Sequence, residues 1–288
     1  MSIILSSHNG RTPPNSGHSR ANAYRFTRLS TSLFIQDLGF SKSDARPGTI
    51  VENVRIERLD GTPATLDEVV DGRPLLIVFG SVTCPMTFGA VDVLRRLHDE
   101  FGDTVKFAML NVREAHPGEN LEQPQSREVK HEHAKLLAAA TSAPWETLVD
   151  TIDGDLHRRL AEKPNAAFLL APNRMVLFRS LWGGDESGLR EALRAVSGGI
   201  GMPKRQSTAA LGPLGLGLGF FTPILERSGR RAKRELLLAA PPVAAFAALA
   251  SVLGPLPLFR RGAAAIALSA AASMAAVLAM AWALYIQF

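Results

Sequence analysis

Cysteine is almost absent from this chain: Cys84 is the single one among 288 residues. One cysteine excludes an intramolecular disulfide and with it a small secreted fold held together by disulfides. It also excludes cysteine-rich zinc sites and an internal dithiol redox pair. Any redox chemistry in this chain therefore depends on Cys84 and on a partner outside it.

Several recognition signals are also missing. The N-terminal residues lack the apolar run of a signal peptide, so no secretory signal is expected. The phosphate-binding pattern GxxxxGK[ST] and the nucleophile pattern GxSxG do not occur. The run His131-Glu132-His133 does not predict a metal site, because side chains two positions apart on a helix point in different directions. We expect no bound metal and no bound cofactor.

Acidic residues are scarce at both ends of the chain. The net charge is +4 over residues 1–50, −6 over residues 51–199 and +7 over residues 200–288. The mildly acidic central block lacks the basic patch typical of nucleic-acid binding, so no nucleic-acid partner is expected.

Composition divides the chain into four parts. Residues 1–32 are predicted to be a disordered basic tail, with an organelle transit peptide as the alternative. Residues 33–198 are predicted to form one globular domain, and residues 199–235 a glycine-rich, basic linker near the membrane. Residues 236–288 are predicted to form a hairpin of two transmembrane helices. Residues 236–259 and 262–288 carry no charge, and each stretch exceeds the roughly 20 residues that a span needs.

The two arginines between these stretches are outnumbered by a basic cluster before them. This cluster consists of Arg227, Arg230, Arg231, Lys233 and Arg234. The positive-inside rule then places residues 1–235 in the cytoplasm. Residues 211–225 are expected to lie along the membrane surface. The alternatives are a soluble pair of alanine-rich helices or a single span.

Hydrophobic patterning in the central block alternates between strands and helices. Strands are predicted at 74–79, 105–112 and 145–150, a hairpin at 166–171 and 175–180, and helices beginning at residues 85, 128 and 189. This order indicates an α/β fold with a central mixed sheet flanked by helices.

Cys84 is the first candidate for chemistry, because it follows a buried strand and precedes a helix that Pro85 opens. The free N–H groups and the positive dipole end of a helix N-terminus both favour the thiolate. The alternative is an inert buried cysteine. Thr87 occupies the position of a resolving cysteine, so an oxidised Cys84 must be reduced by an outside thiol or by another chain.

Two further candidates are expected at the same edge of the sheet. His116 follows the strand that ends near Val112, and strand C-termini form the functional edge of α/β sheets. There it can act as a general acid or base beside Cys84, with Glu114 orienting it; the alternative is a loop histidine without a role. Pro164 precedes the strand at 166–171, where a cis proline would place backbone opposite Cys84, although trans is the common state.

Two motifs in these regions resemble those of the iodothyronine deiodinases. Residues 74–85 read PLLIVFGSVTCP, and residues 114–117, about thirty residues after Cys84, read EAHP. The resemblance covers roughly residues 48–197 and implies a thioredoxin-like fold akin to peroxiredoxins. It implies that Cys84 takes the place of the family's selenocysteine and that His116 is its active-site histidine. The matching supporting residues are Ser81, Thr83, Glu114 and Pro164, the last at the cis-proline position of thioredoxin folds.

Besides the cysteine in place of selenocysteine, and apolar segments near the C-terminus where the family has an N-terminal membrane segment, the chain departs from the family pattern at three places. Val82 stands where the family has a cysteine, and Arg113 stands where it has the first of two glutamates. The residues around Pro164 lack the arginine with which the family clamps the amino acid part of its hormone substrate. These departures leave the substrate open.

The expected protein is a membrane-anchored, one-cysteine thiol oxidoreductase that reduces a small electrophilic substrate through Cys84. Its partners would be an external small-molecule or protein thiol and the lipid bilayer, and a homodimer stays open. Two alternatives remain: a peroxiredoxin-type thiol peroxidase, and a non-catalytic thioredoxin-fold docking module at the membrane.

Overall fold

The computed structural model describes residues 24–200 and 205–285. The tail prediction for residues 1–23 lies outside this range, but residues 24–32 contradict it. Tyr24 is only 2% exposed, and its hydroxyl lies 2.9 Å from Nδ1 of His157. Its ring packs against Gly154, where a Cβ would overlap it. The folded domain therefore includes Tyr24 and does not begin at residue 33, because this aromatic side chain is packed in the core.

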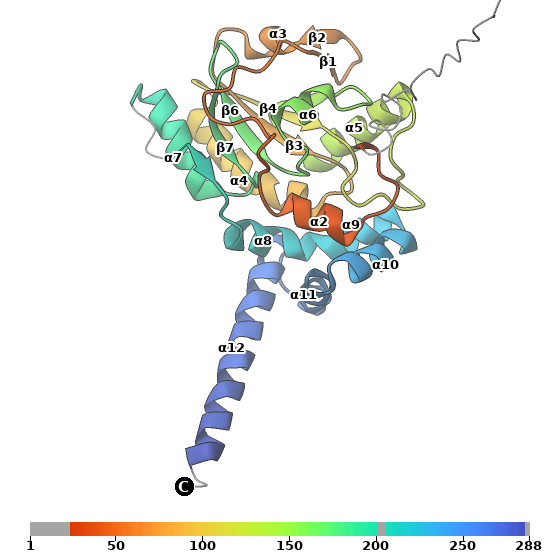
Figure 1. The fold of residues 1–288 in the computed structure, drawn as a ribbon, viewed down its shortest axis with the longest axis vertical. Coiled ribbons are helices and arrows are strands. Elements are labelled where there is room, and N and C mark those ends of the chain that lie inside the picture. The colour runs from red at the N-terminus through yellow and green to blue at the C-terminus, as the bar shows by residue number, and fades with distance from the viewer. Residues whose placement is uncertain (1–23, 201–204, 286–288) are drawn as a thin grey trace, which may run out of the picture.

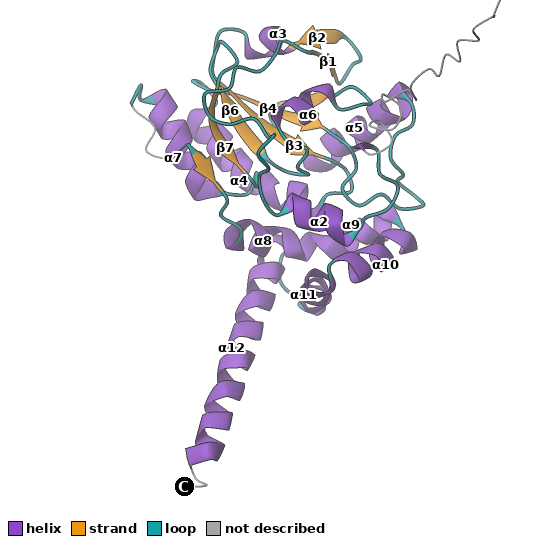
Figure 2. Ribbon diagram, in the orientation of Figure 1, coloured by secondary structure: helices purple, strands orange, loops and turns teal. Residues whose placement is uncertain are grey.

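A mixed sheet forms the centre of the domain (Figure 2). Its strands in the described residues lie in the order β2 (Pro63–Thr65), β1 (Arg55–Arg58), β5 (Glu146–Val149), β4 (Lys106–Asn111), β3 (Leu75–Gly80), β6 (Ala167–Leu170), β7 (Val176–Ser180) and β8 (Gln206–Ser207). Strands β3, β4 and β5 are parallel, and β6 runs antiparallel to β3 and β7. The predicted mixed sheet is confirmed.

Helices cover both faces of this sheet, which explains why β3 is apolar throughout. Leu75, Ile77 and Phe79 enter one buried cluster, whereas Leu76 and Val78 enter the other. The first cluster includes residues of α3 (Leu66–Val70) and α6 (Asp155–Leu160). The second includes residues of α4 (Pro85–Phe101), α5 (Arg127–Thr141) and α7 (Glu186–Ser197). A strand covered on both faces needs a continuous apolar run.

The order β3, α4, β4, α5, β6, β7 and α7, with β3 between β4 and β6, is a thioredoxin-like core. The parallel pairing of β3 with β4 places the ends of both strands at one edge, since Gly80 pairs with Asn111. The β6–β7 hairpin brings the start of β6 and the end of β7 to the same edge, because Ala167 pairs with Ser180. Four loops therefore meet at this edge.

The predicted linker over residues 199–235 is wrong for the part that the structure describes, because most of it is helical and packed on the domain. It folds into α8 (Leu211–Gly217), the 3₁₀ turn η1 (Leu218–Phe220), α9 (Phe221–Ser228) and the start of α10 (Arg230–Ala239). Leu218, Phe221 and Leu225 are each 4% exposed. We call residues 211–239 the collar, since they lie across one end of the domain in Figure 1. Their buried leucine and phenylalanine side chains stabilise this position.

Only one of the two predicted spans is a helix of sufficient length within the described residues. The 25-residue segment Leu258–Trp282 of α12 (Leu258–Tyr285) contains an 18-residue stretch with a mean hydropathy of 2.0, and α12 projects from the collar in Figure 1. The preceding α11 (Pro241–Val252) has 12 residues, about 18 Å at the usual helical rise, against a hydrocarbon core of about 30 Å. Prolines at both ends of this segment limit the helix, because a proline lacks the N–H that would continue it.

Candidate active site

Cys84 lies at the N-terminus of α4, four residues beyond the end of β3. Its backbone N–H donates to the carbonyl of Ser81 at 3.2 Å, and Pro85 is the first residue of the helix. Gly80 is the last residue of β3, and glycine fits there because a Cβ would press on the side chains of Met109 and Thr87. The proline ring presets the dihedral angle that the first helical turn needs. The Cys84 side chain is buried, with 1% exposure.

The two sequence motifs are joined by hydrogen bonds between their loops. The N–H of Ala115 donates to the Ser81 hydroxyl at 3.3 Å, and the N–H of His116 donates to the Thr83 hydroxyl at 3.2 Å. Ser81 and Thr83 are fully buried. The loop that carries Cys84 and the loop that carries His116 thus form one unit at the edge of the sheet.

Glu114 connects this unit to α5. Its fully buried carboxylate accepts from the N–H of Thr83 at 3.0 Å and from the Thr83 hydroxyl at 2.6 Å. Its other oxygen lies 2.8 Å from Nδ1 of His133. An ionised carboxylate only accepts, so the Nδ1 of His133 is the donor to it. We call these three residues the Thr83–Glu114–His133 network. The expectation that Glu114 orients His116 is therefore wrong, because α5 brings His133 to this carboxylate instead.

Sequence reasoning missed His133 as a functional residue. It stands in the run His131-Glu132-His133, whose spacing predicts no metal site, and His131 contacts Glu57 rather than Glu114. Glu114 and His133 stand nineteen positions apart with a loop between them, so no local spacing connects them. In the described residues, no group of three or more histidine, cysteine, aspartate or glutamate side chains is placed to hold a metal ion.

His116 packs its ring against the collar. The ring meets that of Phe221 at a centroid distance of 5.6 Å and an interplanar angle of 64°. Its Nδ1 is buried, and no described residue pairs with it. Burial lowers the pKa of His116 to about 4, because the charged imidazolium loses its solvation. The side chain is therefore neutral at pH 7 in this state.

Burial also dominates the electrostatics of Cys84. It raises the pKa of the thiol to about 11, and the nearby Asp37 of α2 (Thr31–Asp37) acts in the same direction. Thr87 and the backbone N–H groups of Thr87 and Met86 act in the opposite direction. The expected thiolate is thus not favoured in this state. A helix N-terminus contributes only about 1 kcal/mol, which is less than the cost of removing the thiolate from water.

The collar and neighbouring loops cover the thiol with apolar side chains. Cys84 belongs to one buried cluster with Met86 and with residues from the β7–α7 loop and the collar, including Leu181, Trp182, Leu218 and Phe221. Glycines allow the close approach, since a Cβ on Gly89 would come within 2.8 Å of the Gly217 backbone. Cys84 is therefore enclosed by its own chain in the described state.

Pro164 lies in the loop before β6, at the same edge of the sheet. No peptide bond in the described residues is cis, so the cis proline implied by the family resemblance is not present. The trans form is the more stable by about 0.5–1 kcal/mol for an X–Pro bond. Asn165 holds the loop instead. Its side-chain amide donates to the Phe79 carbonyl at 2.9 Å, and its backbone carbonyl accepts from the N–H of Gly183 at 2.7 Å.

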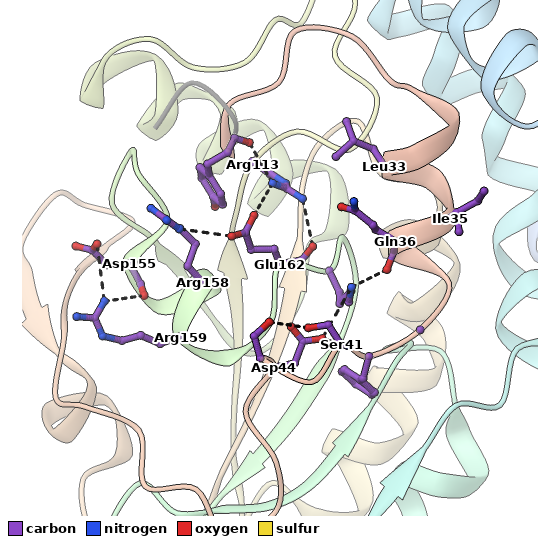
Figure 3. A pocket seen from close by; sticks show the side chains of 15 residues that line it. Leu33, Ile35, Gln36, Ser41, Asp44, Arg113, Asp155, Arg158, Arg159 and Glu162 are labelled. Atoms are coloured by element: carbon purple, nitrogen blue, oxygen red, sulfur yellow. Dashed lines mark hydrogen bonds and ion pairs between the residues drawn. The ribbon is translucent and has the colours of Figure 1, made fainter. Parts of the chain in front are cut away.

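Arg113, which departs from the family pattern, lines a cavity that does not include Cys84. Figure 3 shows its guanidinium facing Glu162, whose carboxylate lies 2.9 Å away. Arg113 also donates to the carbonyl of Tyr24 at 3.2 Å. The cavity has a volume of about 1190 Å³ and is lined by paired charges, among them Arg158 and Lys163. Arg113 thus ties the N-terminal segment to the loop before β6.

These observations define a thioredoxin-fold protein with a single thiol at the start of its first core helix. A model of the iodothyronine deiodinase family matches residues 3–176. Thyroxine 5-deiodinase from Gallus gallus is 36% identical over 86 residues, which are 29% of this chain and 33% of that protein. Type II iodothyronine deiodinase from Neoceratodus forsteri is 36% identical over 59 residues, 20% of this chain and 22% of that protein. The chain belongs to the iodothyronine deiodinase family, a family of oxidoreductases, and its matches span a third or less of these curated relatives.

Solved structures similar to part of this chain include the following two. The thioredoxin domain of a thiol-disulfide oxidoreductase from Bacteroides vulgatus gives a TM-score of 0.40 at 15% identity, over 50% of this chain and 95% of that one. Peroxidoxin BcpB from Mycobacterium tuberculosis gives a TM-score of 0.40 at 16% identity, over 55% of this chain and 99% of that one.

Proposed function

We propose that this protein is a membrane-anchored thiol oxidoreductase that reduces a small electrophilic substrate through Cys84, with an external thiol as reductant. The observation that carries the proposal is the position of Cys84 at the start of α4, next in sequence to the buried Thr83–Glu114–His133 network. Family membership supports the same chemistry. The external thiol follows from composition, since the chain holds no second cysteine.

The reaction balances with two external thiols, and an aryl iodide serves as the example. The Cys84 thiolate attacks iodine; a sulfur–iodine bond forms as the carbon–iodine bond breaks, and the aryl carbon keeps the electron pair and takes a proton. One external thiol then displaces iodide, releases its proton and leaves a mixed disulfide on Cys84. A second thiol attacks this disulfide, regenerates the Cys84 thiol and leaves as the oxidised pair.

The Thr83–Glu114–His133 network provides a route for the protons of this cycle. The Thr83 hydroxyl donates to Glu114 at 2.6 Å, a short distance that is typical of a charge-assisted hydrogen bond. His133 lies at the other end of the same carboxylate, at 2.8 Å. His116, neutral at pH 7, is a second acceptor at the edge of the sheet.

The test is a substrate panel assayed with the wild type and Cys84→Ser in parallel, with dithiothreitol as reductant. Iodide release from an aryl iodide and loss of an organic peroxide are both measured. The proposal predicts turnover with one of these substrates and none with Cys84→Ser. Peroxide loss without iodide release would assign a peroxiredoxin-type activity, and equal rates for both proteins would reject Cys84 as the reacting group.

A second candidate, a non-catalytic docking module at the membrane, is favoured by one observation. Cys84 is 1% exposed, and burial raises its pKa to about 11. At pH 7 only about one thiol in ten thousand is then ionised. This candidate predicts that no substrate in the panel is consumed and that dithiothreitol stays reduced, whereas the enzyme oxidises it with substrate present.

Membrane anchoring through α12 is the second part of the proposal. The apolar segment Leu258–Trp282 is long enough to span, and only 6% of its most apolar part is buried in the protein. The double variant Ala272→Arg, Ala276→Arg should release the protein from the membrane fraction, since each arginine costs about 2.5–3.5 kcal/mol at a helix centre. The matched control Ala272→Leu, Ala276→Leu should stay in that fraction.

The basic collar supports a cytoplasmic position for the domain. In a Cys84→Ser background, Asp60→Cys places a lone thiol at an exposed turn of the domain. An impermeant maleimide should label this thiol only after cells are permeabilised. Labelling of intact cells would show that the domain lies on the opposite side of the membrane.

A further inference from the structure

The buried cluster around Cys84 contains unused hydrogen-bonding atoms. We name its inner residues the Cys84 chamber: Cys84, Met86, Leu181, Trp182, Leu218 and Phe221. We propose that this chamber binds an apolar substrate drawn from the lipid bilayer, and that the collar is the cover through which the substrate enters. The proposal rests on the proposed function, in which Cys84 is the reacting group.

Two polar atoms of the chamber wall have no partner among the described residues. They are Nε1 of Trp182, a residue of the chamber that is 5% exposed, and Nδ1 of His116, which lies beside the chamber with its ring packed on Phe221. An indole N–H can only donate, and leaving a buried donor unpaired costs about 1–3 kcal/mol. A substrate with an apolar body and one hydrogen-bond acceptor would relieve this cost. The rest of the chamber consists of aliphatic, aromatic and sulfur-containing side chains, which suit such a body.

The cover over the chamber is one layer of helix. Leu218 and Phe221 belong to the collar, and a Cβ on Gly217 would overlap the sulfur of Met86. On its other side the collar packs on the start of α12, since a Cβ on Gly262 would overlap the carbonyl of Gly215. The collar helix α8 therefore lies between α4, whose N-terminus carries Cys84, and the start of the proposed membrane helix α12 (Figure 1).

The outer surface of the collar fits a lipid bilayer. Leu211, Leu237 and Leu238 are 77%, 57% and 67% exposed. Basic side chains accompany them, and Arg230 and Arg234 form no ion pair with any described residue. Exposed leucines beside unpaired arginines are typical of a helix at a membrane surface. Each such arginine adds about 1 kcal/mol of attraction to anionic lipid. Because α12 packs on α8 and extends away from the collar, a bilayer that contains α12 would cover this outer surface.

Cys84 labelling tests this proposal, because the chain has no other thiol. The full-length protein is placed in phosphatidylcholine vesicles with or without a third of phosphatidylserine. N-cyclohexylmaleimide is the apolar reagent, and a small sulfonated maleimide is the charged one. The apolar reagent should modify Cys84 about tenfold or more faster with phosphatidylserine, while the charged reagent stays slow in both. Equal rates for the two reagents, or rates that ignore lipid composition, would overturn the proposal.

Two variants locate the effect. Leu237→Glu with Leu238→Glu changes only exposed collar positions and should abolish the acceleration by phosphatidylserine. The matched control Val129→Glu with Leu136→Glu, at two exposed positions of α5, should keep it. Acceleration that persists in the collar variant would remove the collar from the entry route.

The indole donor is tested by protection. A long-chain ketone, with an apolar body and one carbonyl acceptor, should slow labelling of the wild type in vesicles. Trp182→Phe replaces the indole by a smaller aromatic ring without an N–H and should need up to about tenfold more ketone for the same protection. Equal protection in both proteins would reject the Trp182 contact.

These labelling results are independent of turnover. The expected labelling without iodide release or peroxide loss would reject the proposed function and support the apolar chamber. Turnover, together with a labelling rate that is the same for both lipid compositions and both reagents, would support the proposed function and reject the chamber.

Discussion

The carboxylate of Glu114 accepts two hydrogen bonds from Thr83, one from its backbone N–H at 3.0 Å and one from its hydroxyl at 2.6 Å. Glu114 belongs to the loop after β4, and Thr83 to the loop after β3. The pair therefore fixes the residue before Cys84 to the loop that carries His116. Burying a carboxylate is costly unless hydrogen-bond donors pair with it, and these two bonds provide that pairing for the fully buried Glu114.

Replacing Glu114 by glutamine tests the network. Glutamine keeps an oxygen for Thr83 but cannot carry the proton as a carboxylate does. Turnover should fall about 100-fold, as for the loss of one acid–base group, and His133→Gln should cause a similar loss. The double variant should be no slower than either single one, because both residues act in one network. The exposed Glu122→Gln is the control, and a Glu114→Gln enzyme of normal rate would exclude the network from catalysis.

The pH dependence of Cys84 alkylation tests its burial. With a pKa of about 11, the rate for the detergent-solubilised wild type should rise about tenfold per pH unit from pH 7 to 10, whereas a solvated thiol levels off near pH 8.5. Because the folded pKa lies above the unfolded one, the stabilisation of the neutral thiol is complete below about pH 8.5 and is lost as the pH rises through 11. A plateau in the alkylation rate below pH 9 would contradict the buried thiol.

His116 should contribute to acid sensitivity. Its folded pKa of about 4 lies below the usual value, so the stabilisation of the neutral ring is complete above about pH 6.5 and is lost as the pH falls through 4. Between pH 7 and 4.5, His116→Gln should therefore lose about 2 kcal/mol less unfolding free energy than the wild type. Urea unfolding measures this difference. Cys84→Ser, in the same region, should keep the wild-type slope, and equal slopes for all three proteins would contradict the burial of His116.

Asn111 offers a stability test inside the core. Its side chain is fully buried at the end of β4, and neither its amide nitrogen nor its oxygen pairs with a described residue. Asn111→Leu keeps the branched shape of the side chain, although it is larger, and removes two unpaired polar atoms, so the unfolding free energy should rise by about 1–3 kcal/mol. Urea denaturation of both proteins measures the change. A loss of stability would show that the amide is hydrogen-bonded in solution, for example to a buried water molecule.

Much of the domain could be predicted from local sequence patterns. The apolar run at 74–79 predicts β3, because a strand buried on two faces is apolar at every position. The spacing after Pro85 predicts α4, because a helix buried on one face repeats its apolar residues every three to four positions. The edge that joins Cys84 to the His116 loop follows from parallel strands, whose C-termini share one side. The single cysteine by itself requires an external reductant.

Tertiary packing alone decided the state of the site and the partner of Glu114. Local sequence at Cys84 favours a thiolate, but the collar more than a hundred residues later removes its solvent and raises its pKa. His133 reaches Glu114 through the packing of α5, and apolar residues 236–259 divide into short helices at their prolines. Burial and long-range contacts depend on which surfaces meet in three dimensions, and residue spacing along the chain does not record that.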